Sequence, residues 1–477
     1  MIYSELEPKI VFSYFKKISD IPRGSGNEAA VAKFVHDTAV SLGHEAYIDR
    51  SNNVFVRAIS SSGYEDRTPI MLQGHLDMVC EANRDVKHNF MCDPIKLVLD
   101  GDLLRAGGTT LGADDGVAVA IMLALLASDA PHPELECLFT TEEETGLSGM
   151  RNFNASIVKS KRLINIDSAG EGEATVSCAG GVRSHIFFDT ENKTPAYGYD
   201  SLSVFVSGLF GGHSGEDINL GRLGAISAMA RILYSASKVC DVRISNIEAG
   251  SRDNAIPREC FVQLAVSDKD SFERAVRSEE EKIRSELISD DSGFTLKIDT
   301  DTADQFMTSE RTEKLIALLR SLPTGVRAMS RVIPGLVETS SNLAVIRMNR
   351  DCFEIVISSR SSVLSKLDDL MNIIECISGG FGAKCEHVGK YPGWDFVSGS
   401  EMQKLYLKTY RDIFGKEAKI IGIHAGLECG LLKEKLPSMD MISIGPDIKN
   451  LHSPDEVLSV SSLSRLWTLI CEMLKNA

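Results

Sequence analysis

The chain has 477 residues, enough for two or three domains, and its 43 % hydrophobic and 25 % charged content is that of an ordinary globular protein. Its formal net charge of -16 excludes the basic surface that nucleic-acid binding requires. The same charge is compatible with an enzyme whose acidic side chains gather around cations.

Targeting segments and disulfides are not expected. Residues 1–17 mix charged and apolar residues at helical spacing, which is not the pattern of a secretory signal. The longest apolar run, 117–127, is too short to span a membrane and predicts a buried core helix. The eleven cysteines are an odd number and form no CxxC pair, so we expect free thiols in a reducing compartment, the cytoplasm.

The first 60 residues predict two amphipathic helices, 11–18 and 28–42, followed by a pair of strands. A further strand, 69–72, leads directly into His75 and Asp77. In an extended segment these two side chains face the same way, and a carboxylate beside an imidazole orients that ring for a metal. A core histidine with no ligand role is the alternative for this pair on its own.

A glycine-rich segment follows at 109–116 and places Asp114 and Asp115 in front of the apolar helix 117–127. An acidic residue is favoured at a helix N-terminus by the helix dipole. Capping accounts for one of the two aspartates, and the other remains free to act as a ligand.

Three consecutive glutamates, Glu142, Glu143 and Glu144, come directly after the apolar strand 135–139. Repulsion among adjacent carboxylates raises at least one pKa unless a positive charge lies among them. A metal ion supplies that charge, and a spare carboxylate beside a metal can act as a general base. Taken alone, the cluster is more typical of an acidic surface loop, and it is the other motifs that favour a metal site.

Two further segments complete the pattern. The strand 162–166 ends at Asp167, and the strand-like run 440–444 leads through a loop to His452. Sites in open α/β sheets form at the carboxyl ends of the strands, so these side chains should meet there. Imidazole and carboxylate ligands without cysteine suit zinc, manganese or cobalt.

The chain changes character between about 182 and 390. A strand at 201–208 is followed by a glycine-rich turn, 210–215, and by a predicted helix that reaches about residue 236. Two segments, 253–266 and 341–358, each lead through a strand into a helix, which suggests a weak internal duplication. From about residue 394 the chain returns to helix, strand and turn.

The ordered set of motifs resembles the di-zinc metallopeptidases of the aminoacylase/carboxypeptidase-G type. The motifs are Gly-His-Leu-Asp at 74–77, Gly-Ala-Asp-Asp-Gly at 112–116, Thr-Glu-Glu-Glu-Thr-Gly at 141–146, Asp167 and His-Ser-Pro-Asp-Glu at 452–456. Within that family, Gly-Ala-Asp-Asp-Gly, the His-Ala-Gly-Leu-Glu-Cys-Gly stretch at 424–430 and the chain length resemble the aminoacyl-histidine dipeptidase branch. Asp167, where many relatives carry Glu, is also typical of that branch.

The resemblance implies a role for individual residues. One metal would be held by His75, Asp114 and Asp167, and the other by Asp114, Glu144 and His452, with Asp114 bridging. The base precedes the metal-binding glutamate, which makes Glu143 the general base, because Gly146 fixes the register of the triple glutamate. The resemblance also implies that Asp77 orients His75 and that His213 stabilises the oxyanion. The candidates for holding the substrate carboxylate are Asn254, Arg360 and Gly426.

The fold class implied is α/β: a zinc-peptidase-like catalytic domain with a mixed sheet flanked by helices, formed by 1–181 and 391–477, and an inserted α+β lid and dimerisation domain, 182–390. The implied activity is hydrolysis of unblocked dipeptides, of the Xaa-His type or of a broader range. The resemblance also implies a cytoplasmic homodimer. Each chain would bind two divalent ions, most often zinc, with manganese or cobalt as alternatives. An amidohydrolase of N-acyl amino acids and a non-catalytic peptide- or metal-binding relative are the competing hypotheses.

Overall fold

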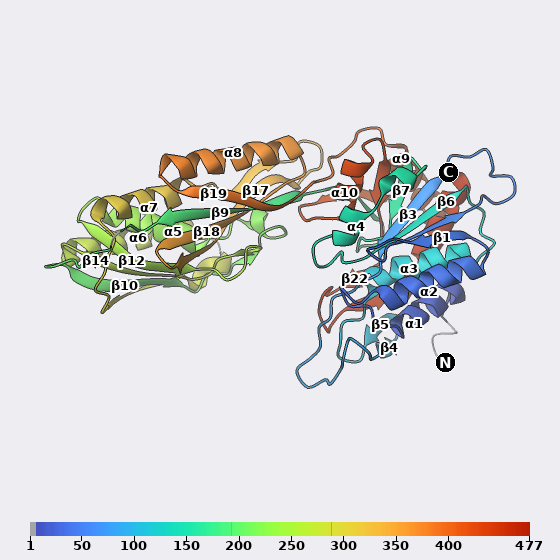
Figure 1. The fold of residues 1–477 in the computed structure, drawn as a ribbon, viewed down its shortest axis with the longest axis horizontal. Helices are drawn as coiled ribbons and strands as arrows, with labels where there is room; N and C mark the ends of the chain where they lie inside the picture. The colour runs from blue at the N-terminus through green and yellow to red at the C-terminus, as the bar shows by residue number, and fades with distance from the viewer. Residues whose placement is uncertain (1–5, 192, 288) are drawn as a thin grey trace. The chain divides into compact units, whose positions relative to one another are not determined.

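The computed structural model describes residues 6–191, 193–287 and 289–477. The chain divides into two compact units, each with its own sheet and helices (Figure 1). Unit 1 comprises Met1–Ser177, Trp394–Gly422 and Leu427–Ala477; unit 2 comprises Cys178–Gly393 and Ile423–Gly426. The short segment Ile423–Gly426 therefore belongs to unit 2, whereas the sequence analysis had placed it in the catalytic domain. No helix of the described residues is long and apolar enough to cross a lipid bilayer.

A mixed sheet, eight-stranded over the described residues, forms the centre of unit 1. Its spatial order is β1 (Glu45–Ile48), β2 (Val54–Ala58), β6 (Leu135–Thr140), β3 (Ile70–His75), β7 (Arg162–Asn165), β21 (Asp440–Ser443), β8 (Glu173–Cys178) and β20 (Lys419–Ile423). Neighbours along the series β6, β3, β7 and β21 run parallel. Their carboxyl ends consequently meet at one edge, which is where the predicted metal ligands follow.

The helices of unit 1 flank this sheet. They are α1 (Lys9–Ser19), α2 (Ala29–Ser41), α3 (Ala113–Leu126), α4 (Ser148–Asn152), α9 (Glu401–Phe414), α10 (Glu428–Lys435) and α11 (Val460–Asn476). In Figure 1, α1, α2 and α3 lie together on one side, with α3 packed against β3 and α1 against α3. From Gly116 to Leu126 every residue of α3 is buried, as expected of a helix that is apolar all round.

A small second sheet lies beside the N-terminus of α3. Its strands, in spatial order, are β22 (Ile448–Lys449), β23 (Val457–Ser459), β5 (Leu103–Ala106) and β4 (Leu97–Asp100). β23 pairs with β5, so that Val457 lies opposite Arg105. The loop before β23 carries His452, and the loop after β5 leads to Asp114 in the first turn of α3, so this pairing brings the two segments to the same place.

Unit 2 is built on an antiparallel sheet with four helices in its described residues. The strand order is β15 (Thr295–Thr300), β10 (Asp200–Ser207), β14 (Cys260–Val266), β12 (Val242–Ala249), β17 (Val337–Asn349), β18 (Cys352–Ser361), β9 (Gly180–Asp189) and β19 (Lys384–Tyr391), with β16 (Gly325–Met329) also paired to β17. The helices are α5 (Ala225–Ala236), α6 (Lys269–Glu286), α7 (Ser309–Ser321) and α8 (Leu364–Gly380). Burial alternates along β10, which is the pattern of a sheet covered on one face.

The topology of unit 2 repeats. The elements β10, α5, β12, β14, α6 and β15 follow one another as βαββαβ. A second such set consists of β9, which precedes the first set in the chain, and α7, β17, β18, α8 and β19, which follow it; the two sets join where β12 pairs with β17. The segments singled out in the sequence, 253–266 and 341–358, end in β14 and within β18, which occupy equivalent positions. The predicted helix after Gly215 was too long, because Gly221, with a φ of 70°, ends a turn first and α5 begins only at Ala225.

Candidate metal centre

The parallel strands of unit 1 place the ligand-bearing segments. His75 is the last residue of β3 and pairs with Thr140, the last residue of β6, so the glutamate cluster begins beside it. Asp167 follows β7, which is the other neighbour of β3. The predicted ligands thus converge because three adjacent parallel strands end at one level.

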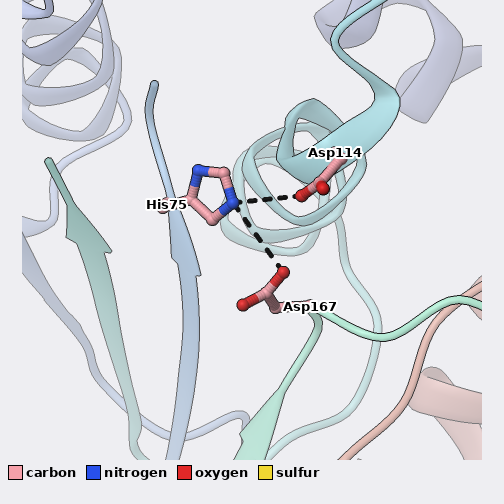
Figure 2. Close-up of side chains that lie close together, drawn as sticks. All are labelled: His75, Asp114 and Asp167. Carbon is pink, nitrogen blue, oxygen red and sulfur yellow. Dashed lines mark hydrogen bonds and ion pairs between the residues drawn. The ribbon is translucent and has the colours of Figure 1, made fainter. Parts of the chain in front are cut away.

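The first group of side chains surrounds the imidazole of His75, which is 1 % exposed. His75 Nε2 lies 3.1 Å from Asp114 Oδ1 and 3.7 Å from Asp167 Oδ1 (Figure 2). Asp114 and Asp167 approach the ring from two different segments, and each directs an oxygen at the same nitrogen. Three ligand atoms that face a common point are arranged as a divalent cation requires.

A second group shares Asp114 with the first. Its other oxygen, Oδ2, lies 3.2 Å from His452 Nε2, and Glu144 Oε1 lies 3.1 Å from the same nitrogen. In each group the ligand atoms all lie within 4.8 Å of one another. Asp114 therefore stands between two clusters and offers one carboxylate oxygen to each, which is the arrangement of a bridging ligand.

Asp77 organises the surroundings of both groups. Its Oδ1 lies 3.3 Å from His75 Nδ1, on the side of the ring opposite the ligand nitrogen. The same carboxylate accepts the backbone N–H groups of Glu143 at 3.1 Å and of Glu144 at 3.2 Å, and the hydroxyl of Ser25 at 2.8 Å. Asp77 therefore fixes the histidine and the glutamate loop relative to one another.

The glutamate loop holds Glu143 beside the ligands. Glu143 forms a third close group with His75 and Glu144. Glu142 turns away: its φ is 50°, its backbone N–H donates to Glu28, and its carboxylate accepts a hydrogen bond from Ser148. The left-handed conformation of Glu142 costs about 1–2 kcal/mol, and it lets two consecutive glutamates, 143 and 144, face the centre.

Negative charge is crowded at this centre. Burial raises the pKa of Asp167 well above its usual value, and burial together with Glu428 and Glu144 raises the pKa of Glu143 to about 8, although His75 opposes that rise. Burial would lower the pKa of His75, but its hydrogen bonds to Asp114 and Asp77 raise it well above the usual value. Crowded carboxylates of this kind are stabilised when a cation lies among them.

The donor set fits divalent metal ions. Glu144 Oε1 is buried and, although His452 Nε2 is near, no group of the described residues is aligned to donate a hydrogen bond to it. A buried carboxylate oxygen without a donor is costly unless it binds a cation. Two imidazole nitrogens and several carboxylate oxygens are the ligands that zinc, manganese and cobalt accept.

Several residues that support the proposed ligands were not predicted from the sequence. These are Ser25 and Glu28, described above; Arg23 and Glu456, which bind the loop of Asp114; and Glu428, which binds Thr140 and Gln73. Glu428 and Glu456 lie within the motifs at 424–430 and 452–456, and this position indicated that they belong to the site. Nothing in the pattern of residues 23–28 indicated that they meet the site.

The remaining predicted site residues lie in unit 2. The backbone C=O of Asn254 accepts a hydrogen bond from Ser214, the neighbour of His213, and β11 (Gly212–His213) pairs with β13 (Ala255–Ile256). Asn254 therefore lies beside the His213 turn. Burial and the positive charge of Arg360 lower the pKa of His213.

Arg360 and Gly426 are connected through Tyr391. Arg360 Nη1 donates a hydrogen bond to Tyr391 Oη at 3.4 Å, and Gly426 faces the same ring. The Nε of Arg360 is buried and has no hydrogen-bond partner among the described residues. Unit 2 thus presents an incompletely paired guanidinium, which is a group that binds carboxylates.

Comparisons with known proteins agree with this geometry. Residues 71–476 match the model of Peptidase family M20/M25/M40. The chain is 38 % identical to the cytosol non-specific dipeptidase of Escherichia coli over 99 % of its own length and 98 % of that protein. The crystal structure of an aminoacylhistidine dipeptidase from Vibrio alginolyticus superimposes with a TM-score of 0.94 at 35 % identity, over 99 % of this chain and 98 % of that one. The aminopeptidase PepT of Bacillus cereus, at 14 % identity and a TM-score of 0.57, shares the fold.

Proposed function

The chain belongs to Peptidase family M20/M25/M40, and we propose that it is a metal-dependent dipeptidase that hydrolyses unblocked dipeptides, including those with a C-terminal histidine. The observation that carries this proposal is Asp114, whose two oxygens face His75 and His452 next to Glu143. The full-length similarity to two dipeptidases supports the substrate class.

In this proposal His75, Asp114 and Asp167 hold one divalent ion, and Asp114, Glu144 and His452 hold the second. Zinc is the metal that we propose first, with manganese or cobalt as alternatives, because the donors are nitrogen and oxygen without sulfur. When bound, two such ions supply Lewis acidity that polarises the scissile carbonyl and lowers the pKa of a water molecule.

Glu143 is the residue that we propose to move protons. Its carboxylate accepts a proton from the attacking water and later donates it to the departing amine. Asp77 holds the backbone N–H groups of Glu143 and Glu144, so the base and a ligand keep a fixed spacing during the reaction. The positively charged surroundings of bound metals would keep Glu143 ionised in the resting enzyme.

Unit 2 supplies the substrate-binding groups in this proposal. Arg360 and the backbone of Gly426 bind the substrate carboxylate, since a guanidinium meets a carboxylate with two parallel hydrogen bonds. His213 stabilises the oxyanion, and Asn254 beside it completes the polar surface. We further propose that the protein is a cytoplasmic homodimer; the cytosolic relative supports the compartment.

The experiment that tests the proposal is a hydrolysis panel of β-Ala-His, Gly-His, Ala-Leu, one tripeptide and one N-acetyl amino acid. We expect metal-dependent cleavage of the dipeptides, with the Glu143→Gln variant at least about 100-fold slower because it lacks the general base. Cleavage of the N-acetyl amino acid alone would support an amidohydrolase instead. No cleavage of any substrate by the metal-loaded protein would support a non-catalytic role.

A further inference from the structure

Glu456 is a buried carboxylate that the mechanism above does not use. It is 2 % exposed and lies four residues beyond His452, immediately before β23. Its position is fixed by the pairing of β23 with β5, because Val457 lies opposite Arg105 in the small sheet. Burying a carboxylate is costly, so its partners show what it contributes.

All four hydrogen bonds to this carboxylate come from one stretch of backbone. Oε2 accepts the N–H groups of Leu111 at 2.7 Å and Gly112 at 3.0 Å. Oε1 accepts those of Ala113 at 2.8 Å and Asp114 at 3.3 Å. The loop that carries the bridging aspartate is therefore attached, through Glu456, to the loop that carries His452.

The His452 loop needs such an attachment. The His452 side chain is 51 % exposed, and the residue has a left-handed φ of 59°. Within the loop, Ser453 Oγ donates to Asn450 O, and Glu456 N donates to Ser453 O. These bonds fix the shape of the loop, and Glu456 bonds it to the backbone around Asp114.

The other side of the Asp114 loop is held by Arg23. The Arg23 side chain is 2 % exposed. Its Nη1 donates to the backbone carbonyl oxygens of Leu76 at 2.8 Å and Asp77 at 2.9 Å. Its Nη2 donates to the backbone carbonyl oxygen of Gly112. The Gly112 peptide thus lies between a buried cation and a buried anion. Arg23 joins the Asp114 loop to the His75 segment, whereas Glu456 joins it to His452.

We propose, on the basis of the function proposed above, that Glu456 is a positioning residue for the second metal, the one held by Asp114, Glu144 and His452. Glu456 keeps Asp114 Oδ2 and His452 Nε2 at the 3.2 Å separation found here. The first group, His75, Asp114 and Asp167, is kept together by Arg23 and by the strand ends. Loss of the Glu456 carboxylate therefore weakens one metal site and spares the other.

The test compares Glu456→Gln with a matched control, Glu136→Gln. Glu136 is also a fully buried carboxylate of unit 1 that accepts backbone N–H groups, those of Lys159 and Ser160, but it lies at the start of β6, away from the metal centre. Both variants remove a buried charge, so both are expected to lose thermal stability. Only a positioning role predicts that metal binding separates them.

Zinc binding is measured by calorimetry, and the zinc retained per chain is measured after dialysis against a buffered concentration of free metal. We expect two ions per chain in the wild type and in Glu136→Gln. In Glu456→Gln we expect one ion with unchanged affinity and a second that binds 10- to 100-fold more weakly. Two ions bound by Glu456→Gln with wild-type affinities would overturn the inference. Fewer than two ions in the wild type would overturn the proposed centre itself.

A measurement on the wild type covers the case in which Glu456→Gln does not fold. Hydrogen exchange of the amides of Leu111 to Asp114 is followed in the metal-free protein. If Glu456 preorganises this loop, these amides are protected before any metal is added. Rapid exchange without metal, with protection only after metal binding, would mean that the metal orders the loop, and would overturn the inference.

Discussion

Buried carboxylates at this centre act through the backbone as much as through ligand atoms. Asp77 accepts two backbone N–H groups and faces His75, and its pKa is lowered because the bonds from His75 and Ser25 outweigh its burial. Hydrogen bonds to a charged group contribute about 1.5–3 kcal/mol each. A residue of this kind fixes geometry without touching the substrate.

Replacing Asp77 by Asn should weaken metal binding 10- to 100-fold, because a neutral amide neither orients His75 as strongly nor accepts both backbone N–H groups. Asp440→Asn is the control, since Asp440 accepts the N–H groups of Glu401 and Met402 and the hydroxyl of Ser400 at the opposite end of the sheet. Competition against a chelating dye measures the affinities. Equal metal affinity in both variants would contradict the role assigned to Asp77.

His424 gives a pH dependence that belongs to unit 2. Burial, aided by the positive charge of Arg360 and opposed by a backbone hydrogen bond, lowers its pKa to about 3. In the unfolded chain His424 takes up a proton near pH 6.5, whereas in the folded chain it does so only near pH 3. The stability of the fold therefore falls as the pH drops through that interval. Between pH 7 and pH 5 the expected loss is about 2 kcal/mol.

The variant His424→Gln should lose about 2 kcal/mol less than the wild type over the same pH change. Denaturant unfolding followed by circular dichroism at the two pH values measures the difference. Parallel losses in both proteins would show that folded and unfolded chains protonate His424 over the same pH range, and would contradict the lowered pKa.

At the level of residues, the proposed ligands can be picked out from the sequence, whereas the residues that support them cannot. His75, Glu144 and Asp167 follow apolar strands, Asp114 precedes an apolar helix, and His452 follows a strand-like run after a loop; that pattern is visible along the chain. Arg23 and Glu28 reach the centre from a turn in the first 30 residues. Their roles depend on which turn packs against which strand end, and this is a property of the fold.

At the scale of elements, the contact between β3 and α3 determines where His75 lies. Gly74 precedes it, and a Cβ at Gly74 would overlap Ala118 Cβ and Asp115 Oδ2. Asp115 in turn accepts the backbone N–H of His75 at 3.0 Å. The glycine therefore permits the close approach of strand and helix that brings His75 to Asp114.

Gly74→Ala is expected to lower stability by about 1–3 kcal/mol through overpacking, and to weaken metal binding because His75 moves. Gly379→Ala provides the contrast: Gly379 lies in α8 with open space around its Cβ position, and the change should stabilise the helix by up to about 1 kcal/mol. Thermal unfolding of both variants and a zinc titration check these signs. Normal metal binding by a stable Gly74→Ala protein would contradict the packing argument.

Secondary-structure prediction succeeded for the mostly apolar runs of the sequence. The strand at 135–139 is β6 (Leu135–Thr140), and the apolar run 117–127 lies within and just beyond α3. It failed near glycine, because the helix expected after Gly215 starts at Ala225. The assignment of Ile423–Gly426 to unit 2 is a tertiary fact, since that short segment packs with unit 2 between two stretches of unit 1.

For the whole molecule, the division into two units separates the proposed metal ligands from the proposed substrate-binding groups. All five proposed ligands lie in unit 1, and so do both tryptophans, Trp394 and Trp467. Tryptophan emission therefore reports the unfolding of unit 1. A metal that binds only folded unit 1 stabilises that unit by mass action, by about 4 kcal/mol at a thousand times its dissociation constant.

Chelation should consequently lower the midpoint of the unfolding transition detected by tryptophan emission. A transition that circular dichroism detects without a change in tryptophan emission should keep its midpoint, because unit 2 carries none of the proposed ligands. Calorimetric scans with and without chelator give the same comparison. An equal shift of every transition would contradict the independence of the two units.

We propose that this chain hydrolyses dipeptides at a centre where two divalent ions would share Asp114 as a ligand, with Glu143 as the base. The most direct measurement is the rate of Gly-His hydrolysis during titration of the metal-free protein with zinc, with bound zinc per chain determined at each point. We expect no activity without metal, full activity at two ions per chain, and a Glu143→Gln protein that binds both ions but is about 100- to 10,000-fold slower. Undiminished hydrolysis by the metal-free protein, or a wild-type rate from Glu143→Gln, would contradict the account.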